Sequence, residues 1–220
     1  MPLAELNGFQ INYELRGAGE PLILIPGFAS GAWTWFRQIE DLSKTFRVVT
    51  FDPRGIGNSR AGASDLQNLS MKTFVEDVVS LLDFLKIEKA HVLGASFGGF
   101  VAQAFALKLP ERLDKLILAC TTAGGKGHVS PELEILRSFT PDPARPLGER
   151  IRKFFRPAFT ENFHARNGDV VEKVCRLREE NEVAEATYQA QLRAAFSFDS
   201  EDEIGRIESE TLVVTGDQDN

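Results

Sequence analysis

A serine stands among glycines in the segment HVLGASFGGFVAQAFAL, residues 91–107. The residues before this serine, Ser96, are typical of a buried strand, and those after it are typical of an apolar helix. A sharp turn between the two would project the hydroxyl above the end of a sheet, where it could attack a carbonyl carbon. Helix amides would point at the same place and suit a developing oxyanion. The sequence therefore predicts a nucleophilic serine at position 96.

The small residues around Ser96 are those that such a turn requires. Gly94 and Gly98 lie two positions before and after the serine, and Gly99 follows. Without a Cβ atom, these residues let neighbouring backbone approach the turn closely. A serine that only caps a helix does not need three flanking glycines, so the pattern favours the nucleophile over a plain N-cap.

An alternation of strand and helix patterns must position this turn. Apolar runs typical of buried strands occupy residues 21–27, 46–52, 90–94, 113–119 and 211–215. Helical spacing of apolar residues predicts helices at 33–43, 71–85 and 97–109. This alternation indicates an α/β fold with a mostly parallel, doubly wound sheet. Two alternating runs around Asn7-Gly8 predict an N-terminal β-hairpin.

Residues 124–209 break the alternation. They contain prolines at the start and then charged helical stretches, and no clear strand. We expect a helical insertion, or lid, in a core formed by residues 1–123 and 210–220. Trp33, Phe139 and Phe155 are candidates to line an apolar substrate pocket. They are equally suited to packing within the core and within the insertion, which needs apolar contacts of its own.

The chain resembles the α/β-hydrolase family. The segments that carry the resemblance are LILIPGFASGAWTW, VVTFDPRGIGNSR, HVLGASFGGFVAQAFALKLPERLDKLIL and TLVVTGDQD, in the family's order. The resemblance implies that Ser96 is the nucleophile and that the backbone N–H groups of Phe28 and Phe97 form the oxyanion hole. Pro26-Gly27 stands where many relatives have His-Gly. Because a backbone N–H binds the oxyanion, this change need not harm the chemistry.

The resemblance also places an acid after one of the late strands. The tip after residues 113–119 contains no carboxylate, whereas the tip after 211–215 reads Gly-Asp-Gln-Asp. The family's G-x-x-D pattern falls on Asp219, which we expect to be the acid. Asp217 is the alternative, and its other role is that of a turn residue.

The histidine base is not at its expected place. In the family order it follows the acid and one more strand, and the sequence ends one residue after Asp219. His91 lies in the strand before the turn, and His128 and His164 lie in the insertion, where packing or surface roles are favoured. We therefore expect a shortened or incompletely represented hydrolase whose C-terminal segment would carry the histidine. The literal chain should be nearly inactive unless His128, His164 or a partner chain supplies the base. Its uncovered sheet edge should invite self-association.

These features predict a cofactor-independent serine hydrolase. It would cleave a small, largely apolar carboxylic ester or lactone through an acyl-enzyme, and the enol-lactonase and carboxylesterase branches of the family are similar. Perhydrolysis and carbon–carbon bond hydrolysis on the same fold are alternatives, as is a non-catalytic or truncated binding protein. A halide-displacing dehalogenase is disfavoured because it needs an aspartate at position 96.

Composition narrows the class of protein further. The chain of 220 residues is 43% hydrophobic and 26% charged, as in globular proteins. A net charge of −7 disfavours nucleic acid and anionic membranes as partners. We expect a cytoplasmic protein because no signal segment or long apolar run is present. Cys120 and Cys175 lie in no metal-binding pattern, so no metal or cofactor is expected, and Cys120 is predicted to be buried.

Two other segments look reactive but are interpreted as scaffold. In DPRGIGNSR, Asp52 and Arg54 are expected to hold neighbouring loops by hydrogen bonds. TAGGKGHV is similar to a phosphate-binding loop, but Cys120 stands where its first glycine is needed and Gly127 where Ser or Thr is needed. A phosphate-binding loop is therefore rejected.

Overall fold

A computed structural model describes residues 2–6, 8–62, 69–129, 132–140, 142 and 144–219. The chain forms two compact units. The first comprises Met1–His128 and Val183–Thr215, and the second comprises Val129–Glu182 and Gly216–Asn220.

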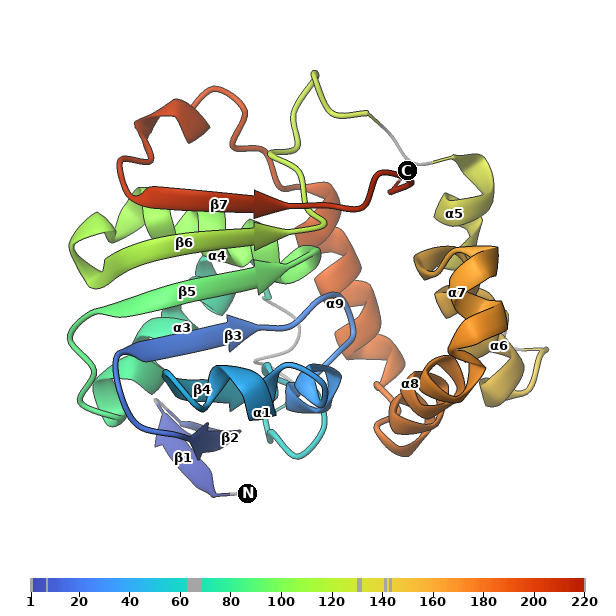
Figure 1. The fold of residues 1–220 in the computed structure, drawn as a ribbon, viewed down its shortest axis with the longest axis horizontal. Helices are drawn as coiled ribbons and strands as arrows, with labels where there is room; N and C mark the ends of the chain where they lie inside the picture. The colour runs from blue at the N-terminus through green and yellow to red at the C-terminus, as the bar shows by residue number, and fades with distance from the viewer. Residues whose placement is uncertain are drawn as a thin grey trace. The chain divides into compact units, whose positions relative to one another are not determined.

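Seven strands of the described chain form one sheet in the first unit, in the order β1-β2-β4-β3-β5-β6-β7 (Figure 1). They are β1 (Leu3–Leu6), β2 (Phe9–Arg16), β3 (Pro21–Ile25), β4 (Arg47–Phe51), β5 (Ala90–Ala95), β6 (Leu113–Ala119) and β7 (Glu210–Val214). Strands β3 to β7 run parallel, and β1 and β2 pair antiparallel. The predicted mostly parallel sheet is confirmed. The prediction was possible because fully buried parallel strands appear in a sequence as continuous apolar runs.

The predicted N-terminal hairpin is also confirmed. Leu6 faces Phe9 in the β1–β2 ladder, so two residues connect the strands. Gly8, the second of them, has φ 90°, a conformation that favours glycine. Asn7 lies outside the described residues.

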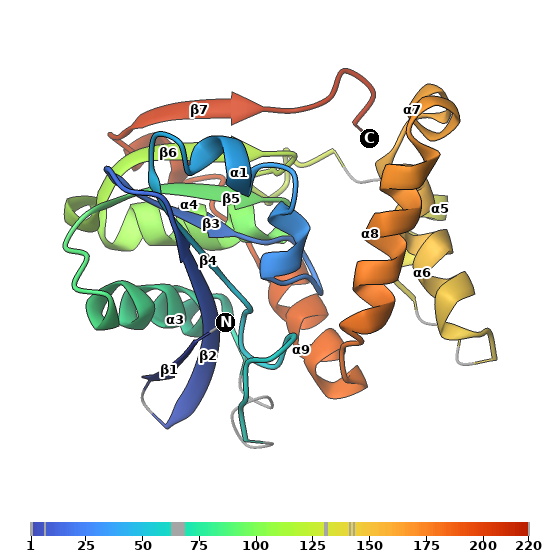
Figure 2. The same ribbon diagram turned by 60° about the horizontal axis from the view of Figure 1, so that its bottom comes forward.

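Helices cover both faces of this sheet, as a doubly wound fold requires (Figure 2). Helices α3 (Met71–Phe84) and α4 (Phe97–Lys108) lie on one face and contact each other. The short elements η1 (Ala32–Trp35) and α1 (Ile39–Leu42) lie on the other. There Trp35 and Ile39 pack on Leu22, Leu24 and Val48. The single helix predicted over 33–43 is thus two short helices, the first tightened to a 3₁₀ turn.

The second unit is helical throughout its described elements. These are α5 (Leu133–Ser138), α6 (Leu147–Phe155), η3 (Arg156–Ala158), α7 (Glu161–Arg166) and α8 (Gly168–Glu180). Helices α6 and α8 contact each other, and Arg152 of α6 pairs with Glu172 and Glu179 of α8. None of the helices that the structure describes is both long and apolar enough to cross a bilayer.

The second unit is shorter than the insertion predicted at 124–209. Helix α9 (Glu185–Phe196) falls within that insertion but belongs to the first unit. The difference has a physical cause, because Gln191 and Tyr188 of α9 contact residues that follow β3. The function of the second unit as a lid stays a prediction.

Candidate active site

Ser96 occupies a strained turn between β5 and α4. Its backbone has φ 52° and ψ −120°, a region that non-glycine residues rarely adopt. The residue is exposed, and its side chain makes no capping hydrogen bond to the helix. The predicted strand-to-helix turn is therefore confirmed, and the alternative of a plain serine N-cap does not describe it.

The glycines around this turn are required by close backbone contacts. A Cβ atom on Gly94 would lie 2.2 Å from the carbonyl oxygen of Gly98. A Cβ on Gly98 would lie 2.2 Å from the carbonyl oxygen of Ile25, and one on Gly99 would lie 2.4 Å from Thr121 Oγ1. Real Cβ atoms do not approach so closely, so any side chain at these positions would displace β3, the turn or the loop after β6.

Hydrogen bonds from three directions fix the turn. The backbone N–H of Ser96 donates to the carbonyl oxygen of Ala119 at 2.8 Å. The Ser96 carbonyl oxygen accepts from Thr121 Oγ1 at 2.9 Å and from the N–H of Gly99 at 2.7 Å. Such over-determination is what holds a strained residue in place.

The loop after β3 passes directly beside Ser96. A Cβ atom built on Gly27 would lie 3.5 Å from the Ser96 Cβ. The next residue, Phe28, is 8% exposed, and its ring meets that of Phe97 edge-to-face at 6.4 Å. Both residues thus flank the serine, one on the loop and one at the first position of α4. Their N–H groups as the oxyanion hole stay a prediction.

The Asp52 carboxylate holds the end of this loop by hydrogen bonds. It accepts hydrogen bonds from the N–H of Ala32 at 2.9 Å, the N–H of Asn58 at 3.0 Å and Asn12 Nδ2 at 2.8 Å. Arg54 Nε donates to Asp77 Oδ2 at 3.1 Å. The expectation that Asp52 and Arg54 hold neighbouring elements by hydrogen bonds is confirmed.

The segment that carries the predicted acid follows β7. In the register of the sheet Val214 pairs with Ala119, and Ala119 pairs with Ala95. β7 therefore ends level with the residue before the serine turn, as the strand preceding a triad acid should. Asp217 and Asp219 follow in the second unit, and the choice of Asp219 stays a prediction.

Each of the three histidine rings lies close to polar groups that are not part of the serine turn. His91 is 5% exposed, with Nε2 3.1 Å from Glu20 Oε2 and Nδ1 3.3 Å from Asp114 Oδ2. It lies early in β5, away from the strand end that leads to the serine turn. His128 Nδ1 lies 3.2 Å from Thr122 Oγ1, and His164 Nε2 lies 3.3 Å from a backbone carbonyl oxygen. We assign none of them as the base.

The candidate pocket residues fall in different units. Trp33 is half-buried in η1 of the first unit. Phe139 and Phe155 are half-buried in the second unit, where each meets Phe154 edge-to-face, at 5.2 and 5.0 Å. These rings therefore contribute to the packing of the helical unit, and their contact with a substrate stays a prediction.

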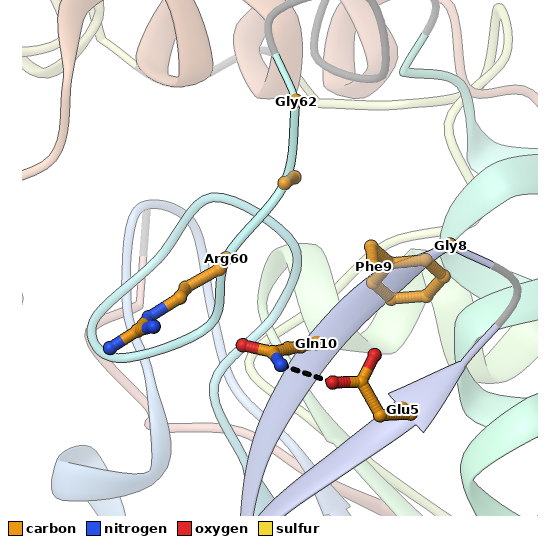
Figure 3. A pocket seen from close by; sticks show the side chains of 7 residues that line it. Glu5, Gly8, Phe9, Gln10, Arg60 and Gly62 are labelled. Atoms are coloured by element: carbon orange, nitrogen blue, oxygen red, sulfur yellow. Dashed lines mark hydrogen bonds between the residues drawn. The ribbon is translucent and has the colours of Figure 1, made fainter.

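A surface hollow lies at the β1–β2 hairpin (Figure 3). Its lining residues are Glu5, Gly8, Phe9, Gln10, Arg60, Ala61 and Gly62. The backbones of Gln10 and Arg60 pair across it, at 3.0 and 2.8 Å. Neither Ser96 nor the loop after β3 belongs to the lining, so this hollow is distinct from the serine site.

The structure corrects the expectation for Cys120. Predicted to be buried, this residue is exposed and has φ 47°. The chain leaves β6 in a left-handed turn there, which the apolar run before it does not indicate. Cys175 is the buried cysteine of the two, and burial raises the pKa of its thiol.

The rejected phosphate loop binds a carboxylate of the same chain. The Glu201 carboxylate accepts from the N–H groups of Lys126 at 2.7 Å and Gly127 at 2.9 Å. These amides, which a phosphate loop would present to its ligand, hold the segment before α5 to the segment after α9.

Sequence reasoning missed Gln191 of α9. It is 1% exposed, and its Oε1 accepts from the N–H of Ala29, in the loop beside Ser96. One available signal was the pair of polar residues Thr187 and Gln191, spaced four apart on a helix face that also carries Ala190 and Ala194.

A doubly wound sheet with a strained, exposed serine turn at the carboxyl ends of its strands defines an α/β hydrolase. Residues 20–220 match the family of the alpha/beta hydrolase fold, so the chain belongs to this family.

Among curated relatives, the chain is similar to the 2-hydroxymuconate semialdehyde hydrolase of Pseudomonas sp. (strain CF600). The two are 32% identical over 192 residues, which are 86% of this chain and 60% of the relative. It is also similar to the putative carbamate hydrolase RutD of Azorhizobium caulinodans, 33% identical over 135 residues, which are 61% of this chain and 50% of the relative. The chain thus spans 50 to 60% of the length of these two relatives.

Among solved structures, the chain is similar to the enol-lactonase from Burkholderia xenovorans LB400. The TM-score is 0.83 at 25% identity, with 98% of this chain and 81% of the enol-lactonase covered. Both relatives are named as hydrolases, and the solved structure is named as an enol-lactonase.

Proposed function

We propose that the protein is a serine hydrolase that cleaves a small, largely apolar carboxylic ester or lactone through an acyl-enzyme. A base takes the proton of Ser96 Oγ as this oxygen attacks the carbonyl carbon, and the N–H groups of Phe28 and Phe97 hold the oxyanion. The base passes the proton to the leaving alkoxide, and the acyl-enzyme remains. A water then gives a proton to the base and attacks the acyl carbon, which releases the acid, and the base returns the proton to Ser96 Oγ. The observation that carries the proposal is the exposed Ser96 in its left-handed turn, with no capping bond to occupy its hydroxyl. Asp219 is proposed to orient the base.

The surroundings of Ser96 support an apolar substrate. The ring of Phe97 packs edge-to-face against those of Phe74 at 5.1 Å and Phe100 at 6.2 Å. Phe100 stacks on Phe198 at 4.6 Å, and Phe28 meets Tyr188 at 4.7 Å. These rings form a continuous aromatic cluster that includes Phe28 and Phe97, the residues that flank Ser96, and apolar surroundings favour apolar acyl groups over charged ones.

The proposal is tested by acylation of the full-length protein. With a p-nitrophenyl ester of a short fatty acid, we expect a burst of p-nitrophenol that approaches one equivalent per chain, followed by slower turnover. A fluorophosphonate should add one label, and peptide mass spectrometry should find it on Ser96. A chain that is folded by circular dichroism but shows neither burst nor label would contradict the proposal.

Hydrolysis of a carbon–carbon bond is the second candidate. It is favoured by the similarity to the 2-hydroxymuconate semialdehyde hydrolase, which covers 86% of this chain. The same serine turn would serve both reactions. Product analysis on a matched pair of substrates, an ester and a dienone with the same acyl group, distinguishes the two. Turnover of the dienone alone would replace the ester proposal.

Strand β7 supports a proposal about association. In the described part of the chain it pairs with β6 alone, and its Leu212, Val213 and Val214 are 57, 65 and 47% exposed. An apolar, unpaired strand edge is a template for another chain. We expect the chain of residues 1–220 to self-associate through β7, and Val213→Lys to shift it to monomer in light scattering after size exclusion. A monomeric unsubstituted chain would refute this.

A further inference from the structure

The loop beside Ser96 contains a tight turn with a strained residue. The N–H of Ser30 donates to the carbonyl oxygen of Gly27 at 3.2 Å, which closes a four-residue turn over 27–30. Ala29, at its third position, has φ 52°, whereas Phe28 is not among the residues with positive φ. This is the pattern of a type II turn, whose third position favours glycine. An alanine there needs outside contacts to stay in this conformation.

Two side chains fix the central peptide of this turn, the one that joins Phe28 to Ala29. At its carbonyl end, Ser30 Oγ donates to the oxygen of Phe28 at 3.2 Å. At its amide end, the N–H of Ala29 donates to Gln191 Oε1 at 2.8 Å. Rotation of this peptide by half a turn would convert the turn to type I and relieve Ala29, but it would break both bonds. Gln191 therefore opposes the relaxation that the strain favours.

Gln191 is poorly suited to a purely structural role. It is 1% exposed, and its Nε2 has no hydrogen-bond partner among the described residues. A buried amide with an unsatisfied donor costs free energy, and an apolar residue of the same length would fill the space without that cost. The bond to Ala29 is what an apolar residue could not make.

We infer that Gln191 is a positioning residue for the reaction at Ser96. By accepting from the N–H of Ala29, it keeps the 27–30 turn in its strained form and thereby fixes the N–H of Phe28 beside the serine. This deepens the proposed function and rests on it, since Phe28 matters only if its N–H binds an oxyanion. The preorganisation of such donors is a large part of acyl-transfer catalysis.

The test compares three variants of the full-length protein. Gln191→Met keeps the size and removes the acceptor, whereas Gln191→Glu keeps an acceptor oxygen in place. Gln189→Met is the matched control: the same change two residues earlier in α9, where the side chain bonds Glu185 instead. Each variant is measured for kcat and KM on an ester, and for amide hydrogen exchange in the peptide that spans 26–32.

For Gln191→Met we expect kcat to fall about tenfold or more at nearly unchanged KM, and exchange of the 26–32 peptide to accelerate by a similar factor. Gln191→Glu should retain slow exchange, and Gln189→Met should match the unsubstituted protein in both measurements. If Gln191 only packed against its neighbours, its replacement by methionine, a residue of the same size, would leave both kcat and KM unchanged.

Two results would overturn the inference. Unchanged exchange in Gln191→Met would show that the bond does not hold the loop. Faster exchange with unchanged kcat would show that the loop does not position the reaction. Failure of the proposed function is distinguishable from both, because the unsubstituted protein would then show no burst and no fluorophosphonate label, while the exchange comparison would still report on Gln191 and Ala29.

Discussion

Replacing Ser96 with alanine is expected to lower kcat/KM for ester hydrolysis by roughly 10⁴-fold or more. The hydroxyl is the protein group that forms a covalent bond to the acyl carbon in the proposed mechanism. The remaining oxyanion donors give little rate without it. Steady-state assays with a chromogenic ester, on protein purified apart from any host esterase, measure the loss.

The fold should survive this change. The Ser96 side chain makes no capping hydrogen bond, and alanine adds no atom to the crowded turn. We expect the thermal midpoint to move by no more than a few degrees. Ser43→Ala, at the end of α1, is the matched control and should keep full activity. Retained activity in Ser96→Ala would remove the serine from the mechanism.

The sequence revealed the parts of the fold that local pattern determines. The central strand β3 is buried along almost its whole length, so it appears as an unbroken apolar run at residues 21–25. The serine turn was equally visible, because each crowding contact forces a glycine into the sequence, as Gly94 and Gly98 show. Helix α3 was predicted almost to the residue, because its apolar residues share one face.

The features that the sequence did not predict depend on contacts between residues far apart in the chain. The bond between Gln191 and Ala29 joins residues 162 positions apart, and no local pattern encodes it. The left-handed turn at Cys120 depends on the exit from β6, where its N–H donates to the carbonyl oxygen of Val214 on the next strand at 2.8 Å. Local sequence pattern therefore predicted the serine itself, but it could not predict the residues, distant in sequence, that hold the backbone around it.

Gly98→Ala is expected to destabilise the protein by roughly 3 kcal/mol or more. The new Cβ would lie 2.2 Å from the carbonyl oxygen of Ile25 and 2.6 Å from that of Pro26. Both are backbone atoms at the end of a central strand, so they cannot move aside as a flexible side chain could. Helix propensity alone would favour alanine over glycine by about 1 kcal/mol, so the sign of the effect tests the contact.

Gly168→Ala supplies the comparison. Gly168 begins α8, and a Cβ there would meet no atom within 4 Å. We expect this variant to be neutral or up to about 1 kcal/mol more stable in urea denaturation, as propensity dictates. If Gly98→Ala were also neutral, β3 and α4 would not be in contact at the serine turn. Because that contact places the Phe28 loop beside Ser96, the proposed oxyanion site would lose its geometric basis.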